Sequence, residues 1–284
     1  MQKIVVLGGN GMAGHVMAEL LSSKPWFTVY GVAREPGSFV AERLDVLDFE
    51  VLGKYLENVN PDYVVNCVGV LVKSSVENIC NAININSYLP NLLSKWGNEL
   101  DFRLIHISTD CVFSGREGGY SENSFRDGDD NYARTKALGE IVNDRDLTIR
   151  TSIIGPELKA NGTGLLDWFL KQKTEVKGYT QAYWSGVTTL ELATATCELI
   201  KQEVTGLIHL CPDRKISKYE LLKHIADIWG KNLAIHPYEG YTVDKSLVCT
   251  RNDFDYTVPD YQKMLQNMKI WMDQRKGYYP HYSI

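Results

Sequence analysis

A series of short apolar runs, separated by helical patterns, constrains the fold of this chain more than any other feature. The strand candidates are KIVVLGG (3–9), TVYGVA (28–33), YVVNCVGV (63–70), FRLIHIS (102–108) and LTIRTSII (147–154). Their apolarity is continuous rather than alternating, which predicts strands that are buried on both faces. Helical patterns lie between them, over residues 12–21, 47–58, 83–97 and 132–143. This order predicts an α/β fold with a doubly wound parallel sheet.

The pattern changes after Ile154, and we expect a second, smaller domain from there. A helix at 188–203 and the run GLIHLC (206–211) look like one more helix–strand unit of the same sheet. From Pro212 to Ile284 the chain reads as helix and irregular segments and is rich in Tyr. We therefore predict a sheet domain of residues 1–154 plus 186–211, and a mostly helical or irregular domain of residues 155–185 plus 212–284.

Composition excludes several classes of protein. The net charge of -5 and the pI near 5.7 argue against a nucleic-acid partner, which needs a basic face. No apolar stretch approaches about 18 residues, so we expect no membrane span, and no signal peptide pattern precedes Ile4. The six cysteines form no C-x-x-C pair and no spaced His/Cys cluster, which predicts reduced thiols in the cytoplasm. His106 and His209 lie inside apolar runs, and we expect core residues there rather than metal ligands.

The glycine-rich sequence GGNGMAGH (8–15) closes the first strand and opens the first helix. It fits G-x-G-x-x-G from Gly9 and equally G-x-x-G-x-x-G from Gly8. Glycines let the backbone approach a pyrophosphate, and the helix N-terminus supplies free N–H groups and the positive end of a dipole. The alternative is an ordinary strand–helix turn. We predict a dinucleotide site, contacted by Gly8, Asn10, Gly11 and Met12.

The second strand ends in GVARE (31–35), where NAD-binding sites carry an acidic residue for the ribose 2′-hydroxyl. Here Ala33 stands at that position and Arg34 follows. A guanidinium can pair with a 2′-phosphate through charge-assisted hydrogen bonds, each worth roughly 1.5–3 kcal/mol. We therefore predict NADPH as the cofactor. The alternative is NADH, with Arg34 as an ordinary solvated side chain.

Two more segments follow strands that we expect near the cofactor. LDVLD (44–48) follows the third strand, and we expect Asp45 and Val46 to contact the cofactor there. Asp45 could accept a hydrogen bond from the adenine amino group, or it could simply cap the next helix. YVVNCVG (63–69) ends the fourth strand with small residues. Beside the adenosine ribose and the nicotinamide we expect Cys67, Val68 and Gly69.

The fifth strand ends in HISTDCVFSG (106–115), which carries the hydroxyls of Ser108 and Thr109. Ligands bind at this carboxyl edge of the sheet in such folds. The next helical segment holds Tyr132 and Lys136, which stand one turn apart on the same face of a helix. A phenol beside an ammonium is a candidate proton donor, because the positive charge pulls the phenol pKa down from about 10.

Two other Tyr-x-x-x-Lys matches occur in the chain, and their settings separate them from this one. Tyr241/Lys245 has a β-branched centre and favours an extended segment, in which residues four apart lie about 13 Å from each other. Tyr219/Lys223 lies in an apolar helical pattern after the last strand of the sheet, which indicates a packing helix. Tyr132/Lys136 alone follows a hydroxyl-bearing strand end.

With these motifs the chain resembles the extended short-chain dehydrogenase/reductase family. The segments GGNGMAG, LDVLD, NCVG, STD and the Tyr132/Lys136 pair occur in the family's order, and STDCVFSG, YARTKALGE and RTSII are most similar to the dTDP-4-dehydrorhamnose reductase group. The resemblance implies a Rossmann domain that binds NAD(P) and a second domain that binds a nucleotide-diphosphate sugar. It also implies that Thr109 lies near the substrate carbonyl, Tyr132 donates the proton and Lys136 holds the nicotinamide ribose.

The chain departs from the group at positions that face the substrate there. Cys111 and Ile153 stand where the group commonly has aromatic residues, so we expect a different sugar. The related 4,6-dehydratases have a second acid after Asp110, and its absence here favours simple reduction. The group's metal-binding acids are not recognisable, and we expect no metal. The substrate residues that the resemblance implies are Val70, Thr109, Asp110, Cys111 and Ile153. In the second domain we expect Trp184 and also Arg251, which could pair with the diphosphate; an ordinary surface Arg is the alternative.

The sequence thus predicts an NADPH-dependent reductase of a nucleotide-linked 4-keto-6-deoxy sugar, working in surface polysaccharide biosynthesis. Two alternatives stay open at this point. One is a nucleotide-sugar 4-epimerase of the same family, and the other is a non-catalytic NAD(P)- or nucleotide-binding regulatory subunit, since fold does not fix function. The expected partner is the sugar nucleotide, with a homodimer as an open point.

Overall fold

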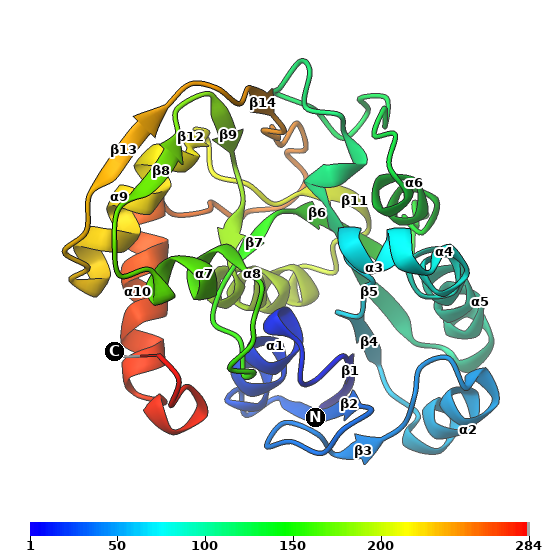
Figure 1. Cartoon of the computed structure of the whole chain (residues 1–284). Coiled ribbons are helices and arrows are strands. Elements are labelled where there is room, and N and C mark those ends of the chain that lie inside the picture. Colours follow the sequence, from blue (N-terminus) through cyan, green and yellow to red (C-terminus); the bar gives the residue numbers. More distant parts are fainter. Residues whose placement is uncertain (283–284) are drawn as a thin grey trace.

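The computed structural model describes residues 1–282, and its centre is a seven-stranded sheet in the order β11-β6-β5-β4-β1-β2-β3 (Figure 1). The strands are β1 (Gln2–Leu7), β2 (Phe27–Ala33), β3 (Glu42–Arg43), β4 (Tyr63–Asn66), β5 (Arg103–Thr109), β6 (Leu147–Thr151) and β11 (Gly206–His209). All neighbouring pairs are parallel. The order reverses between β1 and β4, which confirms the predicted doubly wound sheet.

Helices cover both faces of this sheet, because successive residues of a strand point to opposite sides. On one side, Ile4 and Val6 of β1 belong to the core that includes α1 (Met12–Ser22) and α8 (Thr189–Lys201). On the other side, Val5 and Leu7 pack with α2 (Phe49–Val59) and α5 (Leu89–Leu100). All four β1 side chains are fully buried, as continuous apolar runs predict.

The connection between β4 and β5 is more complex than the single helix predicted over 83–97. It consists of α3 (Val72–Glu77), α4 (Ile79–Ala82), a π-helix η1 (Ile83–Tyr88) and then α5. A π-helix has a wider turn than an α-helix and shifts the register of its side chains. Within η1, Asn86 is fully buried, and its amide bonds both backbone groups of Val70.

The strand predicted over 147–154 breaks at Ser152. β6 stays in the main sheet, whereas β7 (Ile153–Ile154) pairs with β10 (Val187–Thr188). The Val187 N–H donates to the Ser152 carbonyl over 2.8 Å. Because both halves of the run are apolar, the hydrophobic pattern does not reveal the break.

The rest of the chain forms a smaller part, in which two small sheets accompany the expected helices. One sheet has the order β12-β9-β14 and the other pairs β13 with β8. The strands are β8 (Val176–Tyr179), β9 (Ala182–Trp184), β12 (Ile216–Ser217), β13 (Ile235–Tyr238) and β14 (Val243–Asp244). The helices are α7 (Leu165–Lys171), α9 (Lys218–Trp229) and α10 (Tyr261–Asp273). The strands escaped prediction because they are short and mix polar with aromatic residues.

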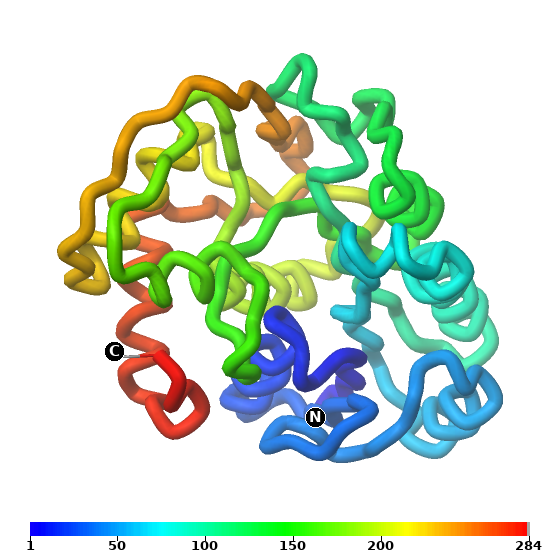
Figure 2. The backbone as a smooth tube through the Cα atoms, in the orientation of Figure 1, coloured from blue at the N-terminus to red at the C-terminus, as the bar shows by residue number. Residues whose placement is uncertain are grey.

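One apolar core joins this smaller part to the main sheet. The cluster that contains α1 and α8 continues through Leu221 of α9 to Met268 of α10. After α10 the chain passes through the 3-10 helix η3 (Lys276–Tyr278) and returns to α1, as the red end of the tube shows in Figure 2. There the Tyr279 hydroxyl donates to His15 Nε2 over 2.8 Å. The division into two domains therefore stays a prediction. No helix within residues 1–282 is both long and apolar enough to cross a membrane.

Candidate active site

The loop between β1 and α1 has the geometry that a phosphate group needs. Gly8 has a φ of +89°, a conformation that favours glycine, and a Cβ at Gly14 would lie 2.0 Å from the Gly8 carbonyl oxygen. No side chain caps α1 at Gly11, so the first N–H groups of the helix face outward for an anion. Asn10 donates to the Glu35 carbonyl over 2.8 Å. Its Oδ1 is buried without a hydrogen-bond partner within residues 1–282, so these residues fit a dinucleotide.

Two segments after β2 and β3 carry the residues expected at the adenosine end. Arg34 directly follows β2 and its side chain is exposed. Asp45 is exposed as well, and its Oδ1 accepts from the Leu47 N–H over 3.0 Å. Asp48, not Asp45, caps α2, because its carboxylate accepts from the third residue of the helix. The Val46 side chain is buried in the core beside α2, so it is not available as a cofactor contact.

The turn after β4 is held in place by two asparagine side chains. The Val68 N–H donates to Asn66 Oδ1 over 3.1 Å, and Asn86 accepts from Val70 N and donates to Val70 O. Cys67 lies within this turn, and burial raises the pKa of its thiol to about 12, so the thiol stays protonated. Gly69 is exposed between the two anchors. The backbone of residues 67–70 is therefore fixed at the carboxyl edge of the sheet.

The end of β5 and the start of α6 (Asn131–Leu138) bring Thr109 and Tyr132 together. Asp130 caps α6 by accepting from the Ala133 N–H over 2.7 Å. Burial raises the pKa of the Tyr132 phenol above its ordinary range, and the nearby Thr109 hydroxyl opposes this shift. The phenol is thus protonated, and the Thr109 hydroxyl beside it donates to Asp110 Oδ1 over 3.2 Å.

Lys136 lies one turn after Tyr132 but points to β5. Its Nζ donates to the Ile107 carbonyl over 2.8 Å and lies 3.3 Å from His106 Nε2. Burial lowers the pKa of Lys136 to about 8. The sequence predicted that the Lys136 ammonium would lower the pKa of the Tyr132 phenol. In the structure, the charged groups that shift this pKa are instead Cys111, Asp110 and Asp130. His106, a core residue as predicted, contacts the candidate site, which the sequence did not suggest.

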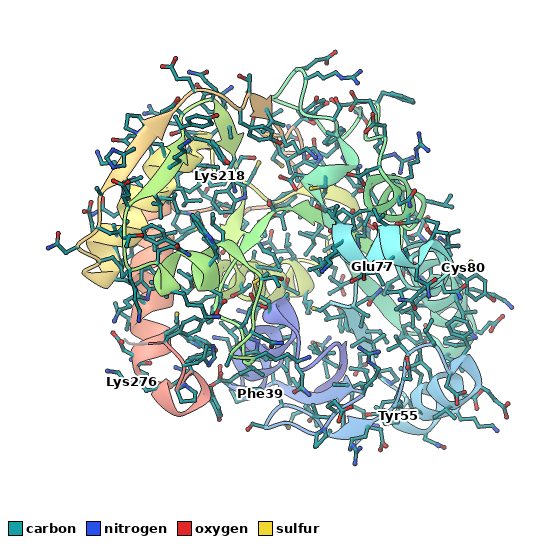
Figure 3. All side chains as sticks on the ribbon, in the orientation of Figure 1. Phe39, Tyr55, Glu77, Cys80, Lys218 and Lys276 are labelled. Carbon is teal, nitrogen blue, oxygen red and sulfur yellow. The ribbon has the colours of Figure 1, made fainter. Side chains whose placement is uncertain are left out.

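A pocket of about 370 Å³ opens beside Asp110 and Cys111, toward the small sheets. Trp184 lines it too, and Ser152 next to Ile153 is part of its wall. Its other aromatic side chains are Trp168, Tyr179, Tyr183 and Tyr241, and its cationic side chains are Lys177, Lys218 and Lys245. Figure 3 shows Lys218 beside the small sheets. The three lysines come from β8, α9 and the end of β14, so no spacing in the sequence connects them.

Asp110 and Lys218 give the floor of this pocket its charge. Burial raises the pKa of the Asp110 carboxyl, and the charges of Lys245 and Lys218 oppose this shift. Burial lowers the pKa of Lys218, which also lies over the Trp184 ring at 5.1 Å. With three lysines in its lining and one carboxyl group, the pocket suits a ligand that carries negative charge.

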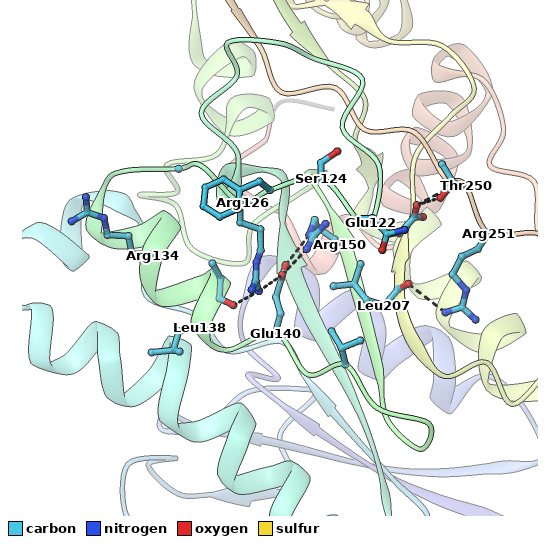
Figure 4. Close-up of a pocket in the computed structure, with 15 residues that line it drawn as sticks. Glu122, Ser124, Arg126, Arg134, Leu138, Glu140, Arg150, Leu207, Thr250 and Arg251 are labelled. Atoms are coloured by element: carbon cyan, nitrogen blue, oxygen red, sulfur yellow. Dashed lines mark hydrogen bonds and ion pairs between the residues drawn. The ribbon is translucent and has the colours of Figure 1, made fainter.

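Arg251, predicted as a substrate residue, does not line this pocket. Its guanidinium pairs with Asp253 and donates to the carbonyls of Thr205 and Leu207, at the free edge of β11 (Figure 4). It lines a different, more open cavity of about 800 Å³ between β11 and α6. Arg251 therefore lies away from the pocket of Trp184, and its side chain covers the backbone of an edge strand.

Several charged groups of the second cavity have partners within the protein. Arg150 and Glu140 form a buried ion pair at 2.6 Å, and Glu122 accepts from the backbone of His209 and Thr250. Within residues 1–282, no three His, Cys, Asp or Glu side chains form a group that could hold a metal ion.

Comparison with known proteins gives this geometry a context. The family described as RmlD substrate binding domain matches residues 1–245. The probable low-salt glycan biosynthesis reductase Agl14 of Haloferax volcanii is 26% identical over 245 residues, which cover 79% of each chain. The methionine adenosyltransferase 2 subunit beta of Mus musculus is 23% identical over 244 residues, covering 81% of this chain and 72% of the relative.

Solved structures agree in fold over almost the whole chain. A hypothetical dTDP-4-dehydrorhamnose reductase from Sulfolobus tokodaii is 26% identical, with a TM-score of 0.78 over 92% of this chain and 98% of the other. A dTDP-4-dehydrorhamnose reductase from Bacillus anthracis, in complex with NADP, is 20% identical, with a TM-score of 0.82 over 95% and 99%. Since the family match spans most of the sequence, this chain belongs to the RmlD family of extended short-chain dehydrogenase/reductases.

Proposed function

We propose that this protein is an NADPH-dependent reductase of a nucleotide-linked 4-keto-6-deoxy sugar. The observation that carries the proposal is the burial of the Tyr132 phenol beside Thr109, Asp110 and Cys111, the last two of which line a pocket of aromatic and lysine side chains. A ketone that binds in the pocket beside Asp110 and Cys111 would be close to the protonated Tyr132 phenol. The proposed setting is surface polysaccharide biosynthesis in the cytoplasm.

The chain's own residues have distinct roles in this reaction. Reduction of a ketone leaves negative charge on the carbonyl oxygen, so a donor must meet it there. Tyr132 donates that proton, and the Thr109 hydroxyl orients the phenol and the substrate carbonyl. NADPH, when bound, supplies the hydride. Lys136 binds the nicotinamide ribose, and Arg34 binds the 2′-phosphate. The pyrophosphate lies on Gly8, Asn10, Gly11 and Met12, and the rest of the cofactor contacts Asp45, Val46, Cys67, Val68 and Gly69.

The pocket fits a nucleotide-diphosphate sugar in charge and in shape. Lysine ammonium groups attract a diphosphate, and aromatic rings cover apolar faces of a sugar and a base. Val70, Asp110, Trp184 and the backbone near Ile153 complete the sugar site. Cys111 and Ile153 are smaller than the aromatic residues of similar reductases, so we propose a sugar with an additional substituent, such as an N-acetyl group.

Replacing Tyr132 by Phe tests the proposed proton donor. The variant should oxidise NADPH with a 4-keto sugar nucleotide at least about a hundredfold more slowly, because general acid catalysis contributes roughly 10²–10⁴-fold. NADPH affinity should stay nearly unchanged, since the phenol contacts the reacting carbonyl. Loss of nicotinamide absorbance measures turnover, and quenching of the protein's tryptophan fluorescence measures binding.

Tyr219 is the matched control, because Tyr219 and Lys223 have the same helical spacing in α9. Tyr219→Phe should keep wild-type turnover. A Tyr132→Phe variant with wild-type turnover would contradict the role of Tyr132.

The relatives named methionine adenosyltransferase 2 subunit beta favour a second candidate function. In this reading the chain binds NADPH as a subunit of another enzyme and reduces nothing itself. NADPH binding without oxidation across a panel of 4-keto sugar nucleotides would support it. A 4-epimerase would instead retain tightly bound cofactor and show no net oxidation of added NADPH.

A further inference from the structure

A buried polar chain runs beneath Lys136, and the proposed reduction gives it no role. It begins with Asn66 at the end of β4, continues with His106 in β5 and ends at Lys136 in α6. Asn66 and His106 are 0% exposed and Lys136 is 4% exposed. Asn66 Nδ2 lies 3.2 Å from His106 Nδ1, and His106 Nε2 lies 3.3 Å from Lys136 Nζ. The three side chains thus form a continuous hydrogen-bond path across two strands.

The backbone N–H of Val68 sets the direction of this path. It donates to Asn66 Oδ1 over 3.1 Å, so the NH₂ end of the Asn66 amide faces His106. An amide NH₂ group only donates, and His106 Nδ1 must therefore accept. Burial is the main cause that lowers the pKa of His106 well below its ordinary value, so the ring is neutral. A neutral ring with an accepting Nδ1 carries its hydrogen on Nε2.

This hydrogen of His106 points at Lys136 Nζ. The same Nζ donates to the Ile107 carbonyl over 2.8 Å. An ammonium has three donor hydrogens and no lone pair, whereas an amine has two hydrogens and one lone pair. The amine alone can accept from Nε2–H and donate to Ile107 at once. We propose that Asn66 and His106 hold Lys136 as a neutral amine in the cofactor-free protein, and that NADPH binding makes Lys136 take up one proton.

The inference rests on the proposed binding of NADPH, whose phosphates bring negative charge that favours an ammonium. The proton comes from the solvent buffer: the Nζ lone pair forms the new N–H bond, and the buffer is left as its conjugate base. The ammonium can no longer accept from His106. Lys136 therefore leaves the ring and turns its three donors to the cofactor.

The other titratable groups around Lys136 do not decide its charge in the cofactor-free protein. Burial lowers the pKa of Lys136 to about 8, while Glu140 just after α6 and Cys67 after β4 act to raise it. Glu140 is already paired with Arg150 and Arg126. Burial raises the pKa of the Cys67 thiol to about 12, so Cys67 stays neutral. The hydrogen-bond direction adds to burial, and both favour the amine in the free protein.

Calorimetric titration of the protein with NADPH tests the inference directly. At about pH 9, in buffers of different ionisation enthalpy, the apparent binding enthalpy should depend on the buffer and indicate uptake of close to one proton per site. The free amine predominates at this pH, which lies above the Lys136 pKa. Lys136→Met should reduce the uptake to about zero. NADPH binding without proton uptake in the wild type would overturn the inference and leave the proposed function standing, whereas absence of NADPH binding would overturn both.

A nearly isosteric variant reverses the direction of the path. In Asn66→Asp, one carboxylate oxygen keeps the Val68 N–H and the other accepts from Nδ1–H, so Nε2 becomes an acceptor for an ammonium. Proton uptake at about pH 9 should then disappear. His106→Gln, whose amide oxygen can face Lys136, should have the same effect without adding a charge. Asn98→Asp on the exposed face of α5 is the control and should keep the wild-type uptake.

Nitrogen NMR of the cofactor-free protein gives a reading that needs no variant and no ligand. His106 should carry its hydrogen on Nε2. A hydrogen on Nδ1 would overturn the inference, because Nε2 would then accept from a charged Lys136.

Discussion

Arg34 is the single residue on which the proposed preference for NADPH depends. Its side chain is exposed, directly after the last residue of β2 and next to Glu35, whose carbonyl anchors Asn10 of the glycine loop. In the proposed function this position lies at the adenosine end of the site. A guanidinium here has room to form two hydrogen bonds with a phosphate.

Arg34→Asp should therefore invert the cofactor preference. The loss of charge-assisted hydrogen bonds, each worth roughly 1.5–3 kcal/mol, should weaken NADPH binding about ten- to hundredfold. NADH should bind as well or better, because a carboxylate accepts from the ribose 2′-hydroxyl. Fluorescence titrations with both cofactors measure the ratio of dissociation constants.

Lys95→Asp, on the exposed face of α5, changes the net charge by the same amount and serves as the control. It should leave the ratio of the two dissociation constants unchanged. Equal ratios in wild type and Arg34→Asp would remove the argument for NADPH.

Residues with a local signature were predictable, and residues assembled by the fold were not. Thr109 ends an apolar run and Tyr132 lies at a helix start, so sequence order alone brought them to one sheet edge. His106 contacts Lys136 through the register of β5 with α6, which no short motif encodes. The position of Arg251 was not predictable, because a surface Arg that covers an edge strand and an Arg that binds phosphate look alike in sequence.

Among the elements, the π-helix η1 links the cofactor side of the site to the catalytic helix. Asn86 accepts from Val70 N over 2.8 Å and donates to Val70 O and to Thr135 of α6. The Ser87 hydroxyl donates to the Thr135 carbonyl. A regular α-helix over these residues would turn Asn86 away from this position. The apolar periodicity therefore predicted a helix here, but it did not predict that Asn86 would hold Val70 and Thr135.

Asn86→Leu should lower the free energy of unfolding by about 2–5 kcal/mol, because each buried backbone group of Val70 that loses its partner costs about 1–3 kcal/mol. Urea unfolding followed by circular dichroism measures this change. Asn84→Leu is the matched control, since Asn84 lies in the same π-helix with an exposed side chain. Its effect should stay within about 0.5 kcal/mol. Similar losses in both variants would mean that η1 itself, rather than the Asn86 bonds, is sensitive to leucine.

At the scale of the whole molecule, the C-terminal segment closes onto the dinucleotide loop. The Tyr279 hydroxyl donates to His15 Nε2, and His15 Nδ1 donates to the Gly11 carbonyl over 2.7 Å. Tyr279 is 1% exposed, and Arg275 pairs with Glu19 of α1 nearby. The first and last parts of the chain therefore stabilise each other, although no sequence pattern within residues 212–284 indicated where this segment would pack.

This contact yields a prediction about stability and cofactor binding together. Tyr279→Phe keeps the packing of the ring but leaves His15 Nε2 buried without a donor, which should cost about 1–3 kcal/mol in the free energy of unfolding. Burial lowers the pKa of His15 to about 4, so at neutral pH the ring stays neutral and does not relieve the loss by charging. NADPH should bind more weakly, because His15 then holds the Gly11 carbonyl less firmly.

Tyr278→Phe is the control. The Tyr278 ring packs on Phe39 at a centroid distance of 4.9 Å, and removal of its hydroxyl should change neither the free energy of unfolding nor the NADPH affinity. Equal stability of the Tyr279→Phe variant and the wild type in urea would show that the buried hydroxyl contributes nothing to this closure.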